Sequence, residues 1–376
     1  MFFRAFFVLY GNFLLWILCS LIWVGIIPYM AFCRLNHFLI NLRAFAHNNL
    51  KILLYAGVNM TELRKCAIIG CGQVGASCAY TFMQSGLFLE MVLIDVNREK
   101  AEGEAMDLNH GLPFRSPMKI YAGDYSDIED ASIIIIAAGA NQREGETRLE
   151  LLSRNAKIMK KITENIISVN KEAILLVVSN PVDILTYMIL HFSGYPSSRV
   201  IGSGTVLDTA RLKYLVGRQL DVDNRNVHTF IIGEHGDSEL AVWSSANISG
   251  IDLSEYVKLS GKCTDMECLY PLYYEVRDSA YNIIKRKGAT YYAIAEAVLR
   301  ICECIVRDEH SVLSVSTLCN GHYGINDICI GVPSIVGRAG VEKVLDIPLD
   351  DYEKLQLQKS VFALSELIES LDIKNY

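Results

Sequence analysis

From about Lys65 onward, the chain alternates short apolar runs with longer amphipathic stretches. Several of the short runs are rich in β-branched residues and apolar without alternation, which is typical of strands buried on both faces of a parallel sheet. We predict strands at Cys66–Gly70, Met91–Val96, Lys119–Gly123, Ile133–Gly139, Ile174–Asn180 and Val200–Gly204. We predict helices between them at Gly75–Ser85, Glu99–His110, Leu149–Asn170 and Val182–Phe192. This order predicts a doubly wound α/β sheet.

After Gly204 the pattern becomes mixed. We predict a helix at Leu207–Leu220, a strand at Val227–Gly233, helices at Cys268–Lys287 and Tyr291–Arg307, β-rich segments at Val312–Cys319 and Ile328–Val336, and a final helix at Leu349–Leu371. The chain is therefore expected to contain a doubly wound domain over 60–204 and an α+β domain over 205–376.

Residues 1–59 form an apolar extension. The run from Ala5 to Cys33 has no charged side chain and exceeds the roughly 20 residues that a helix needs to cross a bilayer. Our expected explanation is a mis-called upstream start, with Met60 as the true first residue and a cytoplasmic protein. The alternatives are a membrane anchor that leaves the rest in the cytosol, as the following basic residues indicate, and a segment lying on the membrane surface.

Charge and cysteine content exclude some classes of site. The net charge is −7, and the sequence has no basic stripe. Both features argue against nucleic acid as a partner. The eleven cysteines show neither a C-x-x-C pair nor a zinc-ligand spacing, so we predict no metal site. We expect free, buried thiols in a reducing compartment.

A glycine-rich loop, Gly70-Cys71-Gly72-Gln73-Val74-Gly75, follows the first predicted strand and opens a helix. In this setting Gly70 permits a tight turn, Gly72 lets the backbone approach a pyrophosphate, and Gly75 allows close helix–strand packing. Asp95 ends the next strand, where a carboxylate accepts hydrogen bonds from the ribose hydroxyls of NAD and repels the extra phosphate of NADP. The first domain is therefore predicted to be a Rossmann domain that binds NAD.

Three further segments carry candidate chemistry. His235, in Gly233-Glu-His-Gly-Asp237, follows an apolar strand and is suited to proton transfer near neutral pH. Asp208 and Arg211 are three apart and share one helix face. The polar, glycine-containing segment from Ala138 to Arg148 is a candidate lid. Each segment has an alternative when it is taken alone. The alternative for His235 is a structural histidine, and for Asp208 and Arg211 it is a surface ion pair. The alternative for the segment from Ala138 to Arg148 is an ordinary solvated loop.

Taken together, these segments resemble the lactate/malate dehydrogenase family. The resemblance runs from about Cys66 to the final helix. The blocks that carry it, in the family's order, are the glycine loop, Asn141-Gln-Arg-Glu-Gly-Glu-Thr-Arg148, Ser179-Asn-Pro-Val-Asp183, Ile201-Gly-Ser-Gly-Thr-Val-Leu-Asp-Thr-Ala-Arg211, Gly233–Asp237 and Lys287-Gly-Ala-Thr-Tyr-Tyr-Ala-Ile294.

The resemblance implies a role for each of these side chains. It makes His235 the proton donor, Asp208 its partner and Arg211 the clamp on the substrate carboxylate. It makes Arg148, carried by the lid, the group that polarises the substrate carbonyl. It places Asn180 beside the nicotinamide and His235, and Thr290 and Ile294 along the site. The implied cofactor-binding residues are Gly70, Gly72, Val74, Gly75, Asp95, Asn180 and Ile294.

Substrate choice depends on the lid. Malate enzymes of this family carry Arg six residues before the position of Arg148, and this chain has Gln142 there, with Arg143 next to it. Gln142 favours pyruvate and L-lactate as the substrate pair. The alternatives are a malate or branched 2-hydroxyacid dehydrogenase and a non-catalytic NAD-binding scaffold, against which the intact set of candidate residues argues.

The resemblance also implies a homo-oligomer, with a tetramer as the expected state. Allosteric bacterial lactate dehydrogenases bind fructose 1,6-bisphosphate across a subunit interface through an Arg at the position of Lys213 and a His at that of His228. Lys213 keeps the charge but loses the planar fork. Regulation by this effector is therefore an open expectation.

Overall fold

The computed structural model describes residues 64–140 and 148–371. The predictions for the apolar extension 1–59 and for lid residues 141–147, Gln142 included, lie outside the described residues. Among the helices in the described ranges, none combines the length and the apolarity that a membrane crossing requires.

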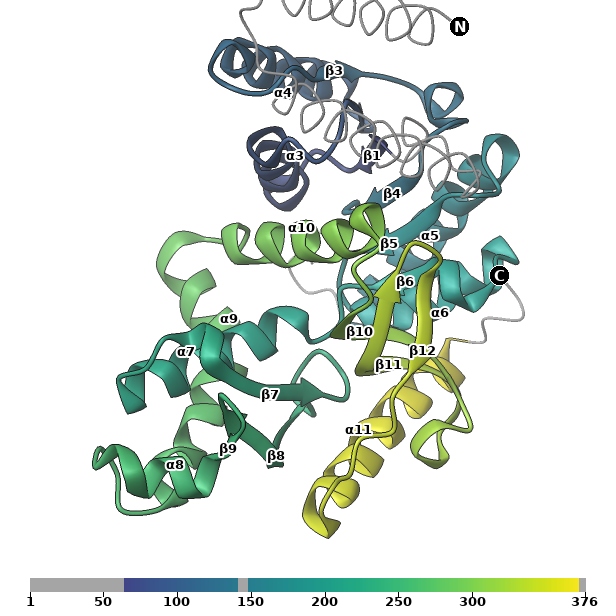
Figure 1. Ribbon diagram of the computed structural model, residues 1–376. Coiled ribbons are helices and arrows are strands. Elements are labelled where there is room, and N and C mark those ends of the chain that lie inside the picture. Colours follow the sequence, from purple (N-terminus) through teal and green to yellow (C-terminus); the bar gives the residue numbers. More distant parts are fainter. Residues whose placement is uncertain (1–63, 141–147, 372–376) are drawn as a thin grey trace, which may run out of the picture. The chain divides into compact units, whose positions relative to one another are not determined.

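One sheet forms the centre of the described chain, in the order β12-β11-β10-β6-β5-β4-β1-β2-β3 (Figure 1). Its parallel strands are β1 (Lys65–Ile69), β2 (Glu90–Ile94), β3 (Lys119–Ala122), β4 (Ile133–Ile136), β5 (Ile174–Val177) and β6 (Val200–Gly202). The chain adds strands on one side of β1 and then returns to add them on the other. The reversal falls between β1 and β4, and open α/β sheets bind ligands at the carboxyl ends of the strands at such a point.

The parallel strands are buried on both faces. All four isoleucines of β4 are fully covered, and they pair with β1 on one side and β5 on the other. The predicted doubly wound sheet is thus confirmed. The predicted strands Ile133–Gly139 and Ile174–Asn180 extend three residues too far, because beyond Ile136 and Val177 only isolated backbone hydrogen bonds continue to the neighbouring strands.

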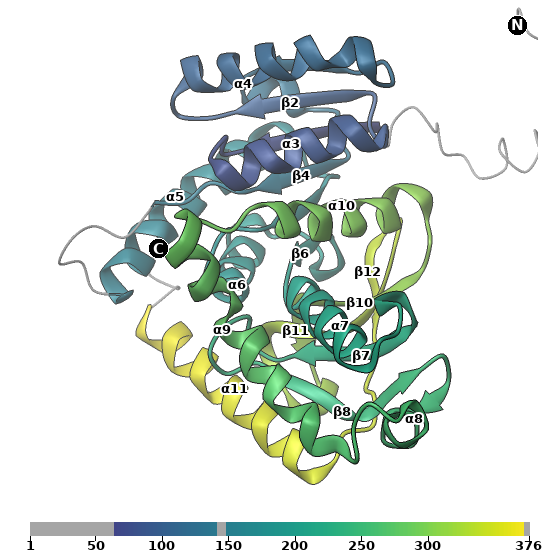
Figure 2. The same ribbon diagram turned by 90° about the vertical axis from the view of Figure 1, so that its left-hand side faces the viewer.

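Helices cover the sheet. They are α3 (Gln73–Ser85), α4 (Arg98–Gly111), α5 (Arg148–Val169), α6 (Val182–Ser193) and, from much later in the chain, α10 (Tyr292–Arg307). Helix α10 lies alongside α3 (Figure 2), so the segment after Thr290 returns to the first part of the fold.

The later strands of the sheet are antiparallel. They are β10 (Ser311–Asn320), β11 (Asn326–Gly337) and β12 (Gly340–Val344), and β10 joins the sheet beside β6, with Ser316 opposite Gly202. The β-rich segments predicted in the second half of the chain therefore extend the first sheet. Strands from both halves of the chain thus belong to one sheet.

A second sheet has the order β7-β8-β9, with β7 at Val227–Ile232, β8 at Leu240–Ile248 and β9 at Ile251–Asp252. Around it lie α7 (Val206–Leu220), α8 (Leu253–Ser260), α9 (Tyr270–Lys287) and α11 (Asp351–Ser370). Residues of α7, α8 and α9 close a second apolar cluster against β7 and β8. The sequence pattern does not predict β8, β9, α8 or β12, because these elements are short or have an irregular alternation of apolar residues.

The cysteine prediction is partly wrong. Seven described cysteines are free and buried, Cys71 among them. Cys263 and Cys268, however, form a disulfide in the loop between α8 and α9. That loop turns back on itself and brings the two Cα atoms to 6.2 Å, a proximity that their spacing in the sequence did not reveal.

Candidate active site

The glycine loop connects β1 to α3 and is shaped by close backbone approach. Gly70 has a φ of +100°, and a side chain there would meet the backbone nitrogen of Ala138 at 2.5 Å. A Cβ on Gly75 would overlap the carbonyl oxygen of Gly70. Both positions therefore require glycine for reasons internal to the fold.

Gly72 differs, because a Cβ there would meet nothing within 4 Å. Gly72 is the N-cap of α3, no side chain caps that helix, and its first turn has no acidic residue. The first N–H groups and the positive end of the helix dipole are thus available to an anion. Val74, in the same turn, is half-buried.

Asp95 follows β2 and faces this loop. Its Oδ2 accepts the N–H of Cys71 at 2.7 Å, and its Oδ1 accepts the N–H of Asn97 at 2.9 Å. These contacts fix the carboxylate beside the loop and leave further lone pairs for hydroxyl donors. A tight loop, an open helix N-terminus and an adjacent carboxylate fit the pyrophosphate and ribose of NAD.

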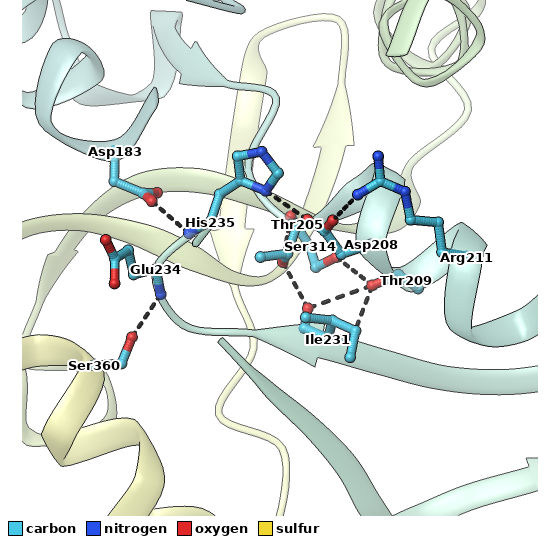
Figure 3. Close-up of polar contacts among 10 residues, drawn as sticks. All are labelled: Asp183, Thr205, Asp208, Thr209, Arg211, Ile231, Glu234, His235, Ser314 and Ser360. Carbon is cyan, nitrogen blue, oxygen red and sulfur yellow. Dashed lines mark hydrogen bonds and ion pairs between the residues drawn. The ribbon is translucent and has the colours of Figure 1, made fainter. Parts of the chain in front are cut away.

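The second part of the site lies around His235, in the turn that follows β7. The Nδ1 of His235 lies 2.6 Å from Oδ2 of Asp208, a residue in the first turn of α7 (Figure 3). Asp208 is only 2% exposed, whereas the His235 side chain is 22% exposed. The pair therefore has a buried carboxylate and an imidazole that reaches solvent.

Burial and nearby charges together set the protonation states of His235 and Asp208. Burial alone would lower the pKa of His235, but the charge and hydrogen bond of Asp208 outweigh it and raise that pKa to about 9. Burial would raise the pKa of Asp208, but His235 and Arg211 hold it below its ordinary value. At neutral pH the histidine is therefore cationic and the aspartate anionic, so the site holds a proton ready for transfer.

Arg211 completes the cluster. Its Nη1 donates to Oδ1 of Asp208 at 2.7 Å, so this carboxylate joins the guanidinium and the imidazole. Arg211 lies on the same face of α7 as Asp208, as its spacing predicted. The remaining donors of its planar fork can bind a carboxylate.

Sequence reasoning missed the residues that hold this cluster in place. Asp183 of α6 is 2% exposed, and its Oδ2 accepts the backbone N–H of His235 at 2.7 Å. Ser360 of α11 accepts the backbone N–H of Glu234 at 2.6 Å. Figure 3 shows both contacts on the far side of the turn from Asp208.

A hydroxyl network fixes α7 against two strands. Thr205 donates to the carbonyl of Ile231 at 2.6 Å, and Thr209 accepts the N–H of Ile231 at 2.9 Å. Thr209 also bonds the hydroxyl of Ser314, in β10, at 2.9 Å (Figure 3). These bonds set the register between Asp208 on the helix and His235 after the strand. Thr205 and Thr209 lie within the segment Ile201–Arg211 that resembles the family, but no local pattern reveals their partners.

The other predicted site residues are more dispersed. Asn180 is exposed just after β5 and forms a cis peptide bond with Pro181. Thr290 is half-buried between α9 and α10, and Ile294, in the first turn of α10, packs against the main core. Arg148 begins α5, but its side chain is outside the described atoms, as is all of Gln142.

The two candidate effector residues lie on α7 and β7. Lys213 is half-buried on α7, and burial lowers its pKa. His228 is exposed on β7. No hydrogen bond or ion pair between these two side chains occurs among the described residues.

Comparison with known proteins decides the family. A model of the lactate/malate dehydrogenase NAD-binding domain matches residues 64–202, and one of the lactate/malate dehydrogenase alpha/beta C-terminal domain matches 205–373. The chain belongs to the lactate/malate dehydrogenase family. It is therefore an oxidoreductase that uses NAD, and the family, enzyme class and cofactor predicted from the sequence are confirmed.

Relatives within this family are similar over nearly their whole length. An L-lactate dehydrogenase of Acetivibrio thermocellus is 52% identical over 315 residues, which covers 84% of this chain and 99% of the relative. L-lactate dehydrogenase 1 of Clostridium acetobutylicum is 52% identical over 312 residues, covering 83% and 100%. Among solved structures, a lactate dehydrogenase from a Medee basin deep-sea metagenome library has a TM-score of 0.81 at 45% identity, covering 82% of this chain and 99% of that one.

Proposed function

We propose that this protein catalyses the reversible reaction pyruvate + NADH + H⁺ ⇌ L-lactate + NAD⁺. The contact of His235 and Arg211 with a single buried carboxylate, that of Asp208, carries the proposal. The curated L-lactate dehydrogenases that share about half of its residues support the choice of substrate.

The cofactor would supply the hydride, and residues of the chain bind the cofactor, bind the substrate and donate the proton. Gly70, Gly72, Val74, Gly75 and Asp95 bind the pyrophosphate and the ribose. Asn180 and Ile294 border the nicotinamide ring.

The remaining residues act on the substrate. Because Asp208 occupies Nδ1 of His235, the Nε2–H is left to donate to the keto oxygen of pyruvate. Arg211 binds the carboxylate through a bidentate pair, and Thr290 lines the same pocket. Arg148 stabilises the charge that develops on the keto oxygen, and Gln142 leaves room for a methyl group where malate enzymes bind a second carboxylate.

A steady-state assay tests the reaction. NADH oxidation is measured with pyruvate, oxaloacetate and 2-ketoisocaproate, and pyruvate is expected to give the highest kcat/KM. His235→Asn should lower kcat by orders of magnitude with little change in NADH affinity, because it removes the proton donor and spares the cofactor loop. His110→Asn, at an exposed histidine of α4, is the matched control. Equal kcat in the two variants would contradict the proposal.

We further propose that the protein is cytoplasmic and forms a homo-oligomer, a tetramer. Each chain is divided into a cofactor domain over 60–204 and a substrate domain over 205–376. Fructose 1,6-bisphosphate is the proposed effector, bound near Lys213 and His228. Light scattering with and without the sugar phosphate, together with pyruvate saturation curves of Lys213→Ala, tests the oligomer and the effector. A monomer, or a curve that fructose 1,6-bisphosphate does not change, would contradict the corresponding proposal.

A further inference from the structure

Glu239 is a buried carboxyl group beside the His235 cluster, and the proposed reaction does not use it. It directly precedes β8 and is only 4% exposed. Its backbone is held firmly, because Tyr273 of α9 donates its hydroxyl to the carbonyl oxygen of Glu239 at 2.5 Å. A long acidic side chain rarely occupies such a place unless it is paired.

The carboxyl group of Glu239 lies within the cluster. One of its oxygens is within 4.8 Å of a carboxylate oxygen of Asp208 and a ring nitrogen of His235. Its Oε1 is buried and has no hydrogen-bond partner among the described residues. Both oxygens of Asp208 are already used, one by Arg211 and one by His235. Glu239 is thus a second acid at the site, and no ion pair joins it to a cation among the described residues.

Charge balance defines the state of Glu239 that the reaction tolerates. With Asp208 anionic and both His235 and Arg211 cationic, a bound substrate carboxylate brings the cluster to neutrality. An ionised Glu239 would add an uncompensated negative charge next to that anion, which is costly in a buried site.

The surrounding groups favour the neutral acid. The titratable groups that face Glu239 are Asp208 and Arg211 from α7, His235 from the turn after β7, and Tyr273 and Arg277 from α9. Burial and the charge of Asp208 outweigh the three cations and raise the pKa of Glu239 to about 9.

We propose that Glu239 is a positioning residue that admits the substrate carboxylate only while it is itself a neutral carboxylic acid. Its ionisation then limits pyruvate binding at alkaline pH together with that of His235. This inference rests on the proposed function and deepens it, because it assigns the site a second proton that is held but never transferred.

A count of protons distinguishes this role from a purely structural one. If both His235 and Glu239 must be protonated, kcat/KM for pyruvate falls about a hundredfold per pH unit well above their pKa values. If only His235 matters, the fall is about tenfold per unit. The two groups interact, so these slopes belong to the pair.

The experiment compares the slopes of three proteins between pH 7 and about 10.5, above the pKa of about 9 that both groups have. Glu239→Gln stays neutral at every pH, and we expect its slope to correspond to one proton. Glu239→Asp is the matched control, because it can still ionise, and we expect it to keep the two-proton slope of the parent. A Glu239→Gln slope equal to that of the parent, or the same loss of slope in Glu239→Asp, would overturn the inference.

A second measurement does not depend on the variants folding. Oxamate, an unreactive isostere of pyruvate, is added to the parent enzyme with NADH at about pH 10, and an indicator dye reports the protons taken up. Uptake clearly above one proton per site supports the inference, whereas one or fewer refutes it. Failure of the parent to reduce pyruvate at neutral pH would instead refute the proposed function, so the two failures are distinguishable.

Discussion

Asp208→Asn gives the most direct test of how the site holds its proton. The substitution keeps an oxygen that can accept from Nδ1 of His235 but removes the negative charge. Burial lowers the pKa of His235, and the charge of Asp208 is the largest of the causes that raise it, ahead of the charges of Asp183 and Glu239. Without the charge of Asp208 the pKa should therefore fall from about 9 toward the ordinary 6.5. A full return to 6.5 corresponds to about 3 kcal/mol in favour of the protonated ring.

The expected loss of activity follows from this shift. At about pH 7.5 a pKa of about 9 leaves roughly 97% of His235 protonated, and a pKa of about 6.5 leaves roughly 9%. Pyruvate reduction needs that proton, so kcat/KM should fall by up to about tenfold from protonation alone. Since the charged histidine is the form present below its pKa, the alkaline limb of the pH profile should move to lower pH, by up to about two units.

The assay is the pH dependence of kcat/KM for pyruvate from about pH 5 to 10, at saturating NADH. Asp107→Asn, at an exposed acid of α4, is the matched control and should follow the parent. An alkaline limb at the same pH in Asp208→Asn and in the parent would refute the conclusion that Asp208 raises the pKa of His235.

Four further measurements test other parts of the protein. Arg211→Lys should raise KM for pyruvate at least about tenfold with a smaller change in kcat, because the bidentate fork is lost; an unchanged KM would show that Arg211 does not bind the carboxylate. Because the carboxylate of Asp95 repels the extra phosphate of NADPH, we expect kcat/KM for NADH to be at least about tenfold above that for NADPH. Equal values would refute the role of Asp95 in selecting the cofactor. Gln142→Arg should shift preference from pyruvate toward oxaloacetate, and a parent that already prefers oxaloacetate would disprove the assignment of the substrate. A chain that begins at Met60 should bind NADH and turn over as the full chain does, because the contacts described at the site come from Gly70 onward; a loss of activity would refute this.

Local features of the site could be predicted from the sequence. The glycine loop, α3 and Asp95 lie within a short stretch of chain, and each is marked by a residue type that its geometry requires. Asp208 and Arg211 are three residues apart on one helix, so their proximity follows from the helical repeat.

The long-range part could not be predicted in this way. Asp183 and His235 are 52 positions apart, and Ser360 and Glu234 are 126 apart. Their contacts depend on α6 and α11 meeting at the same turn, which no local pattern encodes. The antiparallel addition of β10 beside β6 is of the same kind, because strand order depends on which apolar faces pack together.

The contact between Ser360 and the turn of His235 has a consequence for the order in which the enzyme is completed during synthesis. The ribosome makes the glycine loop and Asp95 early, and α11 last of the described elements. A nascent chain can therefore hold every part of the cofactor loop while the backbone N–H of Glu234 still lacks its acceptor. The residues that shape the cofactor loop are therefore synthesised before the residue that fixes the turn of the proton donor, and only the nearly finished chain contains both.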